Sequence, residues 1–145
     1  MKALSMIQPW ASLVAYRQKK NETRSFACPK KVIGMRVAIH ASLTKSAIQD
    51  GTAAKLWALT ALELPEEWPL GSIVAVVTIT GCTPTEKVRD RVDDFEKAFG
   101  DYSSGRFAWH LDDVRKLREP IPMKGMLGFW TVPAEFDHLL LEAGK

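Results

Sequence analysis

The stretch from Ser72 to Thr80, SIVAVVTIT, restricts the possible folds of this chain more than any other segment. It is a continuous apolar run rich in β-branched residues, which is typical of a strand buried on both faces. We therefore expect it to form the central strand of the fold. The chain has 145 residues, so one domain with one hydrophobic core is the expected arrangement.

Shorter patterns predict the other strands. Alternating apolar residues predict strands at Met35–Ala41, Arg106–Leu111 and Leu127–Val132. The segment EPIPMKG, which precedes the last of these, is rich in proline and glycine and predicts a turn. The run KKNETRSF from Lys19 to Phe26 is expected to be extended.

The first predicted helix opens at Pro9 and ends near Gln18. Trp10, Leu13 and Val14 recur at helical spacing, so this face should pack inward.

Three more helices are expected later in the chain. Ser42 or Thr44 is predicted to cap a helix that Gly51 interrupts, and Pro133 is predicted to open a short C-terminal helix. Thr85 is predicted to cap an amphipathic helix that ends at Gly100. The apolar stripe of this helix would contain Val88, Val92, Phe95 and Phe99.

The order of strands and helices favours the α+β class. The strand spacing is irregular, and the chain has neither the glycine-rich dinucleotide motif nor the P-loop motif, which argues against a doubly wound sheet. A small mixed β-barrel with flanking helices fits better.

Composition and the rarer residues exclude several classes of protein. Hydrophobic residues make up 46% and charged residues 26%, as in ordinary soluble globular proteins. No apolar run could cross a bilayer and the N-terminus has no signal-peptide pattern, so we expect a cytoplasmic protein that does not enter a membrane. Cys28 and Cys82 lack ligand spacing and the three histidines are scattered, so we expect buried free thiols, no metal and no cofactor.

A dense run of charged side chains follows the first helix. Between Arg17 and Lys31 there are six cations and a single anion, Glu22. If this segment is extended, Lys20, Glu22 and Arg24 lie on one side, because side chains alternate along a strand. One interpretation is a carboxylate that organises cations for phosphate binding. The alternative is a solvent-exposed edge of ion pairs.

Several motifs occur in a fixed order along the chain. They are QPWA from Gln8, K-x-x-E-x-R spelled by Lys19, Glu22 and Arg24, and G-x-x-x-x-I-H-A-S from Gly34 to Ser42; WPLGSIVAVVTITGC, RFAWHL and PIPMKGMLGFW follow. In this order they resemble the ASCH domain family, relatives of the PUA-like RNA-binding barrels. The resemblance implies a single PUA-like barrel over residues 1–133, followed by a short C-terminal helix or tail over residues 134–145.

The resemblance also implies a cleft. In it, the loops after Gln18, after Lys30 and around Tyr102–Ser104 would converge with the helix start at Gln8–Trp10. Trp10 and Tyr102 would stack on an unpaired base. The ligand-binding residues that the resemblance implies are Gln8, Trp10, Lys19, Lys20, Glu22, Arg24, Ser25, His40, Tyr102 and Ser103. Ordinary structural roles are the alternatives, with Trp10 in the core and His40 as a semi-buried, hydrogen-bonded histidine.

Three functional hypotheses follow. The first is a binding module for RNA or for single-stranded or modified nucleotides, preferring single-stranded RNA to duplex DNA. The second is a metal-independent hydrolase, because members of the resembled family act on N4-acylated cytidine or cleave single-stranded RNA. Lys19 and Glu22 would then be catalytic, and Glu86 is the candidate for a further carboxylate. The third is an interaction domain with a vestigial cleft. The oligomeric state is left open.

Overall fold

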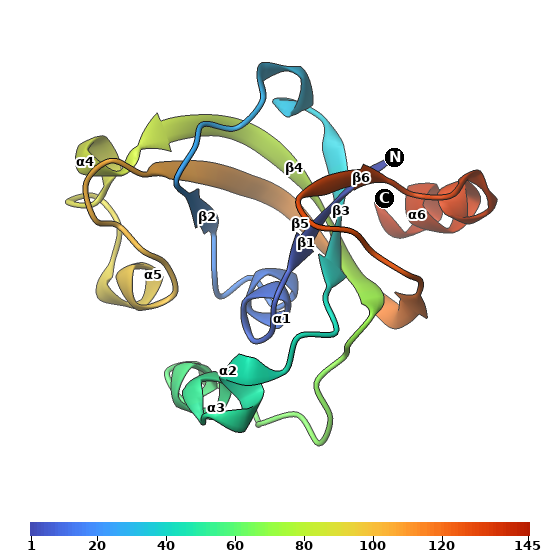
Figure 1. The fold of residues 1–145 in the computed structure, drawn as a ribbon, viewed down its shortest axis with the longest axis horizontal. Coiled ribbons are helices and arrows are strands. Elements are labelled where there is room, and N and C mark those ends of the chain that lie inside the picture. The colour runs from blue at the N-terminus through green and yellow to red at the C-terminus, as the bar shows by residue number, and fades with distance from the viewer.

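One six-stranded mixed sheet organises the computed structural model, which describes residues 1–145 (Figure 1). The strand order is β2-β5-β4-β3-β1-β6, and all neighbouring strands are antiparallel except β1 and β3. The α+β class with helices flanking a mixed sheet is confirmed. The strands are β1 (Lys2–Met6), β2 (Asn21–Arg24), β3 (Arg36–Ala41), β4 (Ser72–Pro84), β5 (Phe107–Pro122) and β6 (Phe129–Thr131).

The predicted central strand is confirmed as β4, whose residues 72–77 are all buried. Its pairing with β5 shifts register between Ile73 and Ala75, and again at two places further along the strand. Such bulges bend a strand and increase its twist. Figure 1 shows the result: β4 and β5 curl together into a half-barrel that the other strands extend.

β5 is longer than predicted, because it continues through Pro120 and Pro122, where a turn was expected. β2 pairs only with residues 107–110 of β5, so beyond Leu111 one edge of β5 has no strand beside it. Prolines are tolerated on such an edge because no ladder hydrogen bond is lost there.

α1 (Trp10–Ala15) lies in the hollow of the half-barrel, near the centre of Figure 1. Leu13 and Val14 are fully buried and Trp10 is half-buried, so the predicted inward face is confirmed. The helix ends at Ala15 rather than near Gln18, and Arg17 has a positive φ of 60°. The chain therefore turns sharply before it enters β2.

The predicted helix from Thr85 to Gly100 is wrong. Two short helices, α4 (Thr85–Val88) and α5 (Asp94–Ala98), occupy this segment. Asp93 divides them, because its extended backbone and its side chain cap α5 by accepting a hydrogen bond from the Glu96 N–H. Phe95 is consequently exposed, whereas Phe99 is buried.

Gly51 interrupts the preceding helical segment as predicted, with a φ of 87° between α2 (Ser46–Gln49) and α3 (Thr52–Trp57). The predicted cap by Ser42 or Thr44 is wrong, because Lys45 precedes α2 and no side chain caps it.

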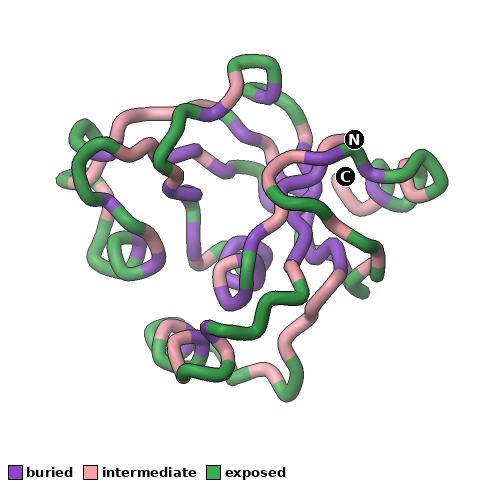
Figure 2. The backbone as a smooth tube through the Cα atoms, in the orientation of Figure 1, coloured by how far each residue is buried: buried purple, intermediate pink, exposed green.

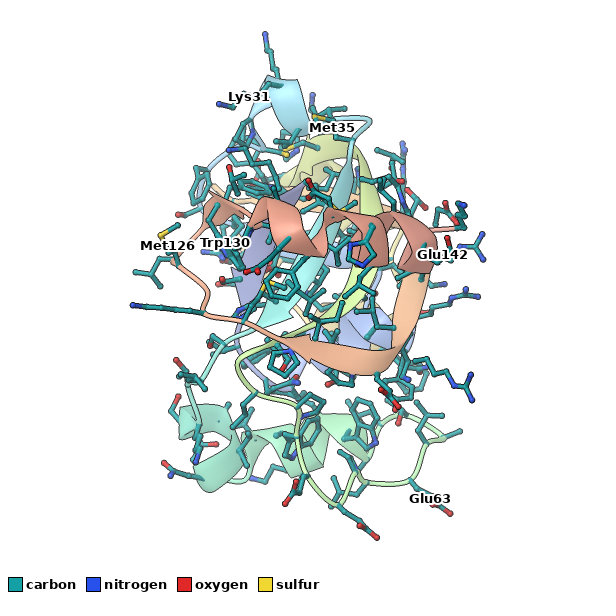
Figure 3. All side chains as sticks on the ribbon, turned by 90° about the vertical axis from the view of Figure 1, so that its right-hand side faces the viewer. Lys31, Met35, Glu63, Met126, Trp130 and Glu142 are labelled. Carbon is teal, nitrogen blue, oxygen red and sulfur yellow. The ribbon has the colours of Figure 1, made fainter.

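The C-terminal segment forms η2 (Ala134–Phe136) and α6 (Asp137–Ala143) after Pro133. Figure 3 shows α6 lying across the sheet over Trp130, and Leu140 is fully buried in the same cluster. The buried backbone concentrates in the middle of the molecule, while η1 (Lys30–Val32), α2, α3 and α5 lie at its rim (Figure 2). None of the helices has the length and apolar character needed to span a membrane.

Candidate functional site

A cleft of about 620 Å³ opens where β1 and β2 meet the loop after α5. Its apolar lining includes Trp10, Phe99 and Leu127, and Leu127 is 97% exposed. Its charged wall consists of Glu22, Arg24, Asp101 and Arg106. Polar groups thus converge on an otherwise apolar hollow, which is the usual composition of a ligand site.

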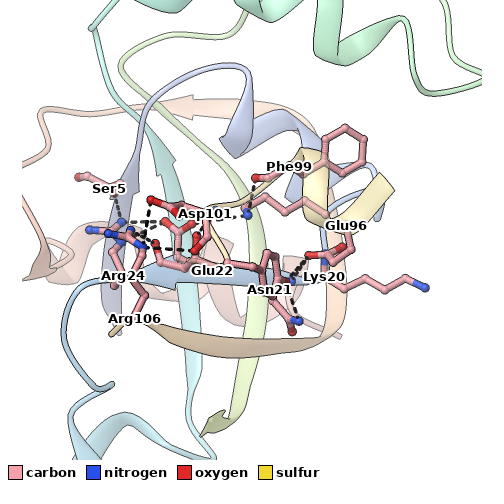
Figure 4. A network of polar contacts seen from close by, with 12 residues as sticks. Ser5, Lys20, Asn21, Glu22, Arg24, Glu96, Phe99, Asp101 and Arg106 are labelled. Atoms are coloured by element: carbon pink, nitrogen blue, oxygen red, sulfur yellow. Dashed lines mark hydrogen bonds and ion pairs between the residues drawn. The ribbon is translucent and has the colours of Figure 1, made fainter. Parts of the chain in front are cut away.

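Glu22 and Arg24 form the centre of the charged wall, on the same side of β2 (Figure 4). Arg24 donates to Glu22 Oε2 from Nε at 3.1 Å and from Nη2 at 2.9 Å. The side chain of Glu22 is only 11% exposed, so the alternative of a solvent-exposed ion-pair edge is wrong. Two hydrogen bonds from one guanidinium fix the direction of the carboxylate.

Lys19 supports Glu22 from inside the protein. Its side chain is 1% exposed, its Nζ donates to the Phe99 carbonyl oxygen at 2.8 Å, and Nζ lies 3.8 Å from Glu22 Oε1. Burial lowers the pKa of Lys19, although Glu22 and Glu96 act to raise it. Lys19 itself does not line the cleft.

Lys20 has a different position from the one that simple alternation predicts. Figure 4 shows its side chain extending away from Glu22 and Arg24. The strand begins only at Asn21, so the two-residue period does not reach back to Lys20.

Arg24 is held from three sides. Besides Glu22, its Nη2 donates to the Ser5 carbonyl oxygen at 3.2 Å, and its guanidinium carbon lies 5.7 Å from the ring centre of Trp109. A cation above an aromatic face is attracted by the ring's negative π-surface. The hydrogen bonds of Arg24 to the protein use Nε and Nη2, and its Nη1 makes none.

Asp101 and Arg106 complete the charged wall, and the sequence-based interpretation missed both. Arg106 Nε lies 3.4 Å from Asp101 Oδ2, and its Nη2 donates to the Thr23 carbonyl oxygen. Asp101 Oδ1 accepts hydrogen bonds from the hydroxyl and the N–H of Ser103, which lower the pKa of Asp101. The pattern D-x-S in the loop GDYSSG is the signal for this turn.

Tyr102 is buried behind the cleft and does not line it. Its hydroxyl accepts from Asn21 Nδ2 at 3.1 Å and lies 3.5 Å from Glu96 Oε1. Burial, together with the Glu96 carboxylate, raises the pKa of Tyr102 to about 12. Asn21 Oδ1 in turn contacts His110 Nδ1 at 3.0 Å, and His110 Nε2 contacts Thr83. This chain of hydrogen bonds joins α5, β2, β5 and β4 beneath the site.

The other predicted residues lie outside the cleft. Gln8 is fully buried and donates to the Pro69 carbonyl and the Ser12 hydroxyl, so it anchors the start of α1. His40 is buried too, with its Nε2 2.9 Å from the Met123 carbonyl oxygen and its ring edge-on to Trp130. Ser25 is exposed, and Ser103 acts on the cleft only through Asp101.

Glu86, the candidate for a further carboxylate, also lies away from the cleft. It accepts hydrogen bonds from the Gly105 N–H and the Thr85 hydroxyl. The structure therefore brings Trp10, Glu22 and Arg24 into the cleft, with Lys19 behind them, and provides Asp101 as its second carboxylate. No three His, Cys, Asp or Glu side chains gather where they could hold a metal ion.

Comparison with solved structures identifies the fold. A crystal structure of ASCH from Zymomonas mobilis has a TM-score of 0.58 and 13% sequence identity, over 97% of this chain and 93% of that one. The chain has the ASCH fold. Two mutants of the same Zymomonas protein, one Ser-to-Ala and one Tyr-to-Phe, have TM-scores of 0.58 and 0.57 at 13% identity. They cover 97% of this chain and 94% and 96% of their own.

No family model matches this sequence, and no curated protein sequence does. The likeness to the Zymomonas structures nevertheless confirms the barrel type that the ordered motifs implied.

Proposed function

We propose that the cleft binds one nucleotide unit of RNA or a single-stranded or modified nucleotide. The observation that carries the proposal is that two guanidiniums line the cleft and each is fixed through Nε and Nη2 while Nη1 is left without a protein partner. Guanidiniums held in this way suit phosphate oxygens, because their N–H groups are already oriented.

The remaining groups of the cleft suit a base. Glu22 and Asp101 offer carboxylate acceptors for exocyclic amino groups, and the half-buried ring of Trp10 offers an apolar surface. Unstacked bases are typically recognised by such edge contacts together with stacking. The cleft lies among loops and strand ends and presents no long helix to a major groove, which favours single-stranded RNA over duplex DNA.

The test is titration calorimetry with cytidine and cytidine monophosphate, and fluorescence anisotropy with single-stranded RNA and duplex DNA at equal salt. Arg24→Lys and Arg106→Ala should each weaken binding of the monophosphate about tenfold or more, because a hydrogen bond to a charged group is lost. Arg118→Ala, at an exposed position outside the cleft, is the charge-matched control and should have no effect. Binding that neither cleft variant changes, or duplex DNA binding as tight as that of single-stranded RNA, would contradict the proposal.

A metal-independent hydrolase is the second candidate, and the geometry of Glu22 favours it. Glu22 presents a pre-oriented carboxylate to the cleft, which suits a general base, and Arg24 beside it could stabilise an oxyanion. In this function Lys19 positions Glu22 rather than touching the substrate, since it does not line the cleft.

Incubation with N4-acetylcytidine, and separately with labelled single-stranded RNA, in the presence of a chelator separates the two candidates. Product that forms with the wild-type protein and disappears in Glu22→Gln, at a temperature at which thermal melting shows the variant to be folded, establishes the hydrolase. If the protein binds nucleotides but forms no product in either assay, the hydrolase hypothesis is wrong.

A further inference from the structure

A second hollow adjoins the cleft and has the same size, about 620 Å³. We call it the α5 groove. Besides Phe99, its lining consists of Arg17, Gln18, Lys20 and Asn21, of residues 59–61 in the turn after α3, and of Arg91, Val92, Asp93, Phe95 and Glu96 at the start of α5. Phe99 lines both the cleft and the α5 groove, so the two hollows are neighbours.

The cations of the α5 groove have little to neutralise them. Lys20 and Arg91 are exposed, and neither side chain forms an ion pair or a hydrogen bond with the protein. The side chain of Arg17, also exposed, donates hydrogen bonds only to the Val114 carbonyl oxygen and has no carboxylate partner.

The two carboxylates of the groove are directed at backbone groups. Asp93 caps α5 through the Glu96 N–H, and the carboxylate of the buried Glu96 accepts from the N–H groups of Lys20 and Asn21. The lining therefore holds three cations against two carboxylates, and none of the three cations forms an ion pair with a protein carboxylate, which favours the binding of an anion from solution.

The α5 groove also exposes an aromatic ring. Phe95 is 55% exposed and Leu59 is 44% exposed on its lining. Phe95 belongs to none of the hydrophobic core clusters, although it is part of the apolar stripe that the sequence predicts for this helix. An exposed ring next to unpaired cations is the combination that binds single-stranded nucleic acids, because bases stack and phosphates pair.

We propose that the α5 groove is a second subsite, which binds the phosphodiester backbone and one base of single-stranded RNA whose neighbouring nucleotide lies in the cleft. The inference rests on the proposed function and specifies it: the ligand is an oligonucleotide rather than a free nucleotide. Lys20 and Arg91 contact phosphates, and Phe95 stacks on a base.

The experiment measures the affinity of a labelled dodecamer of single-stranded RNA by anisotropy over a range of salt concentrations, and that of cytidine monophosphate by calorimetry. The double variant Lys20→Ala with Arg91→Ala removes two charges from the groove. The matched control, Lys30→Ala with Lys31→Ala, removes two exposed charges from η1, on another side of the molecule (Figure 1). All four positions are exposed, so the variants should fold, which thermal melting verifies.

The groove variant should bind the dodecamer about tenfold more weakly than the wild type does. The slope of its log affinity against log salt concentration should be about 1.4 smaller in magnitude, because each lost phosphate contact to a single strand contributes about 0.7. Its affinity for cytidine monophosphate should not change. Phe95→Ala should weaken dodecamer binding at least about fivefold and leave the slope unchanged, because stacking carries no charge. The control variant should retain more of the dodecamer affinity than the groove variant.

The outcomes separate the two proposals. The α5 subsite is overturned if the wild-type protein binds the dodecamer no more tightly than the monophosphate. It is also overturned if the groove variant binds the dodecamer as tightly as the wild type does. Neither outcome affects the cleft proposal. Loss of dodecamer binding in the groove variant, with no effect of Arg24→Lys on either ligand, supports the groove and overturns the cleft. An acidic peptide that binds the groove as tightly as the dodecamer overturns the RNA assignment.

Discussion

The two hydrogen bonds that Arg24 donates to Glu22 end on the same carboxylate oxygen, Oε2. The other oxygen, Oε1, lies 3.8 Å from Lys19 Nζ. The carboxylate is therefore held from the cleft side by a half-buried guanidinium and from the interior by a buried amine. This arrangement fixes the charged wall of the cleft before any ligand arrives, so little ordering is needed on binding.

Removing the charge of Glu22 should cost both stability and binding. Glu22→Gln leaves two cations without their common partner in a nearly buried position, and we expect a loss of about 2–4 kcal/mol in the free energy of unfolding. Chemical denaturation measures this loss. The control is Glu142→Gln, whose carboxylate pairs with Lys145 at 78% exposure and should change stability by less than about 0.5 kcal/mol. Equal effects of the two substitutions would show that the Glu22 pairs are as weak as surface pairs.

Because of Lys19, the stability of the protein should increase with pH. Burial lowers its pKa below the ordinary value of 10.5, so between the two values the unfolded chain binds a proton that the folded protein does not. Stability from this group therefore rises with pH across that window. The unfolding free energy of the wild type minus that of Lys19→Met should rise with pH and level off above 10.5. A difference that is constant with pH would mean that Lys19 titrates equally in both states.

Tyr102 should have the opposite effect at alkaline pH. Its folded pKa is raised from 10.0 to about 12, so its contribution to stability is complete below 10.0 and is lost as the pH rises through about 12. Tyr102→Phe should remove this part of the alkaline loss, as measured by denaturation over a pH series. Tyr16→Phe, at an exposed position outside the network, should retain it. Identical alkaline curves for the two variants would contradict the burial of the Tyr102 hydroxyl.

Sequence reasoning succeeded where the cause is local. The double-sided burial of β4 and the inward face of α1 follow from periodicities within one segment, and both are confirmed. Glu22 and Arg24 stand two positions apart on one strand, so their shared side of the sheet also follows from the sequence alone.

Sequence reasoning failed where segments that are distant in the chain meet. Asp101 and Arg106 reach the cleft because β2 pairs with β5, which places Arg24 opposite Phe107. No local pattern specifies that register. The break between α4 and α5 had a different cause, because the capping side chain of Asp93 outweighed an apolar stripe that would have continued the helix.

Gly125 should be intolerant of even one added methyl group. A Cβ at this position would lie 2.5 Å from Cε1 and 2.6 Å from Nδ1 of His40, which is closer than Cβ atoms approach other atoms in real structures. The ring cannot easily yield, because it is buried between its contact with the Met123 carbonyl oxygen and the edge of Trp130. We expect Gly125→Ala to lower the unfolding free energy by about 1–3 kcal/mol, the usual cost of overpacking. Met126→Ala, its exposed neighbour, is the control and should stay within about 0.5 kcal/mol of wild type.

A double-mutant cycle identifies the cause of this loss. In a His40→Ala background the ring is gone, so the added methyl of Gly125→Ala should cost much less than it does in the wild type. Equal costs in the two backgrounds would mean that the loss arises from the backbone of the loop and not from the ring. Leu127 and Gly128, which line the cleft, stand two and three positions after Gly125 in the chain. Gly125→Ala should therefore also weaken nucleotide binding, and His40→Ala in the same chain should restore part of it.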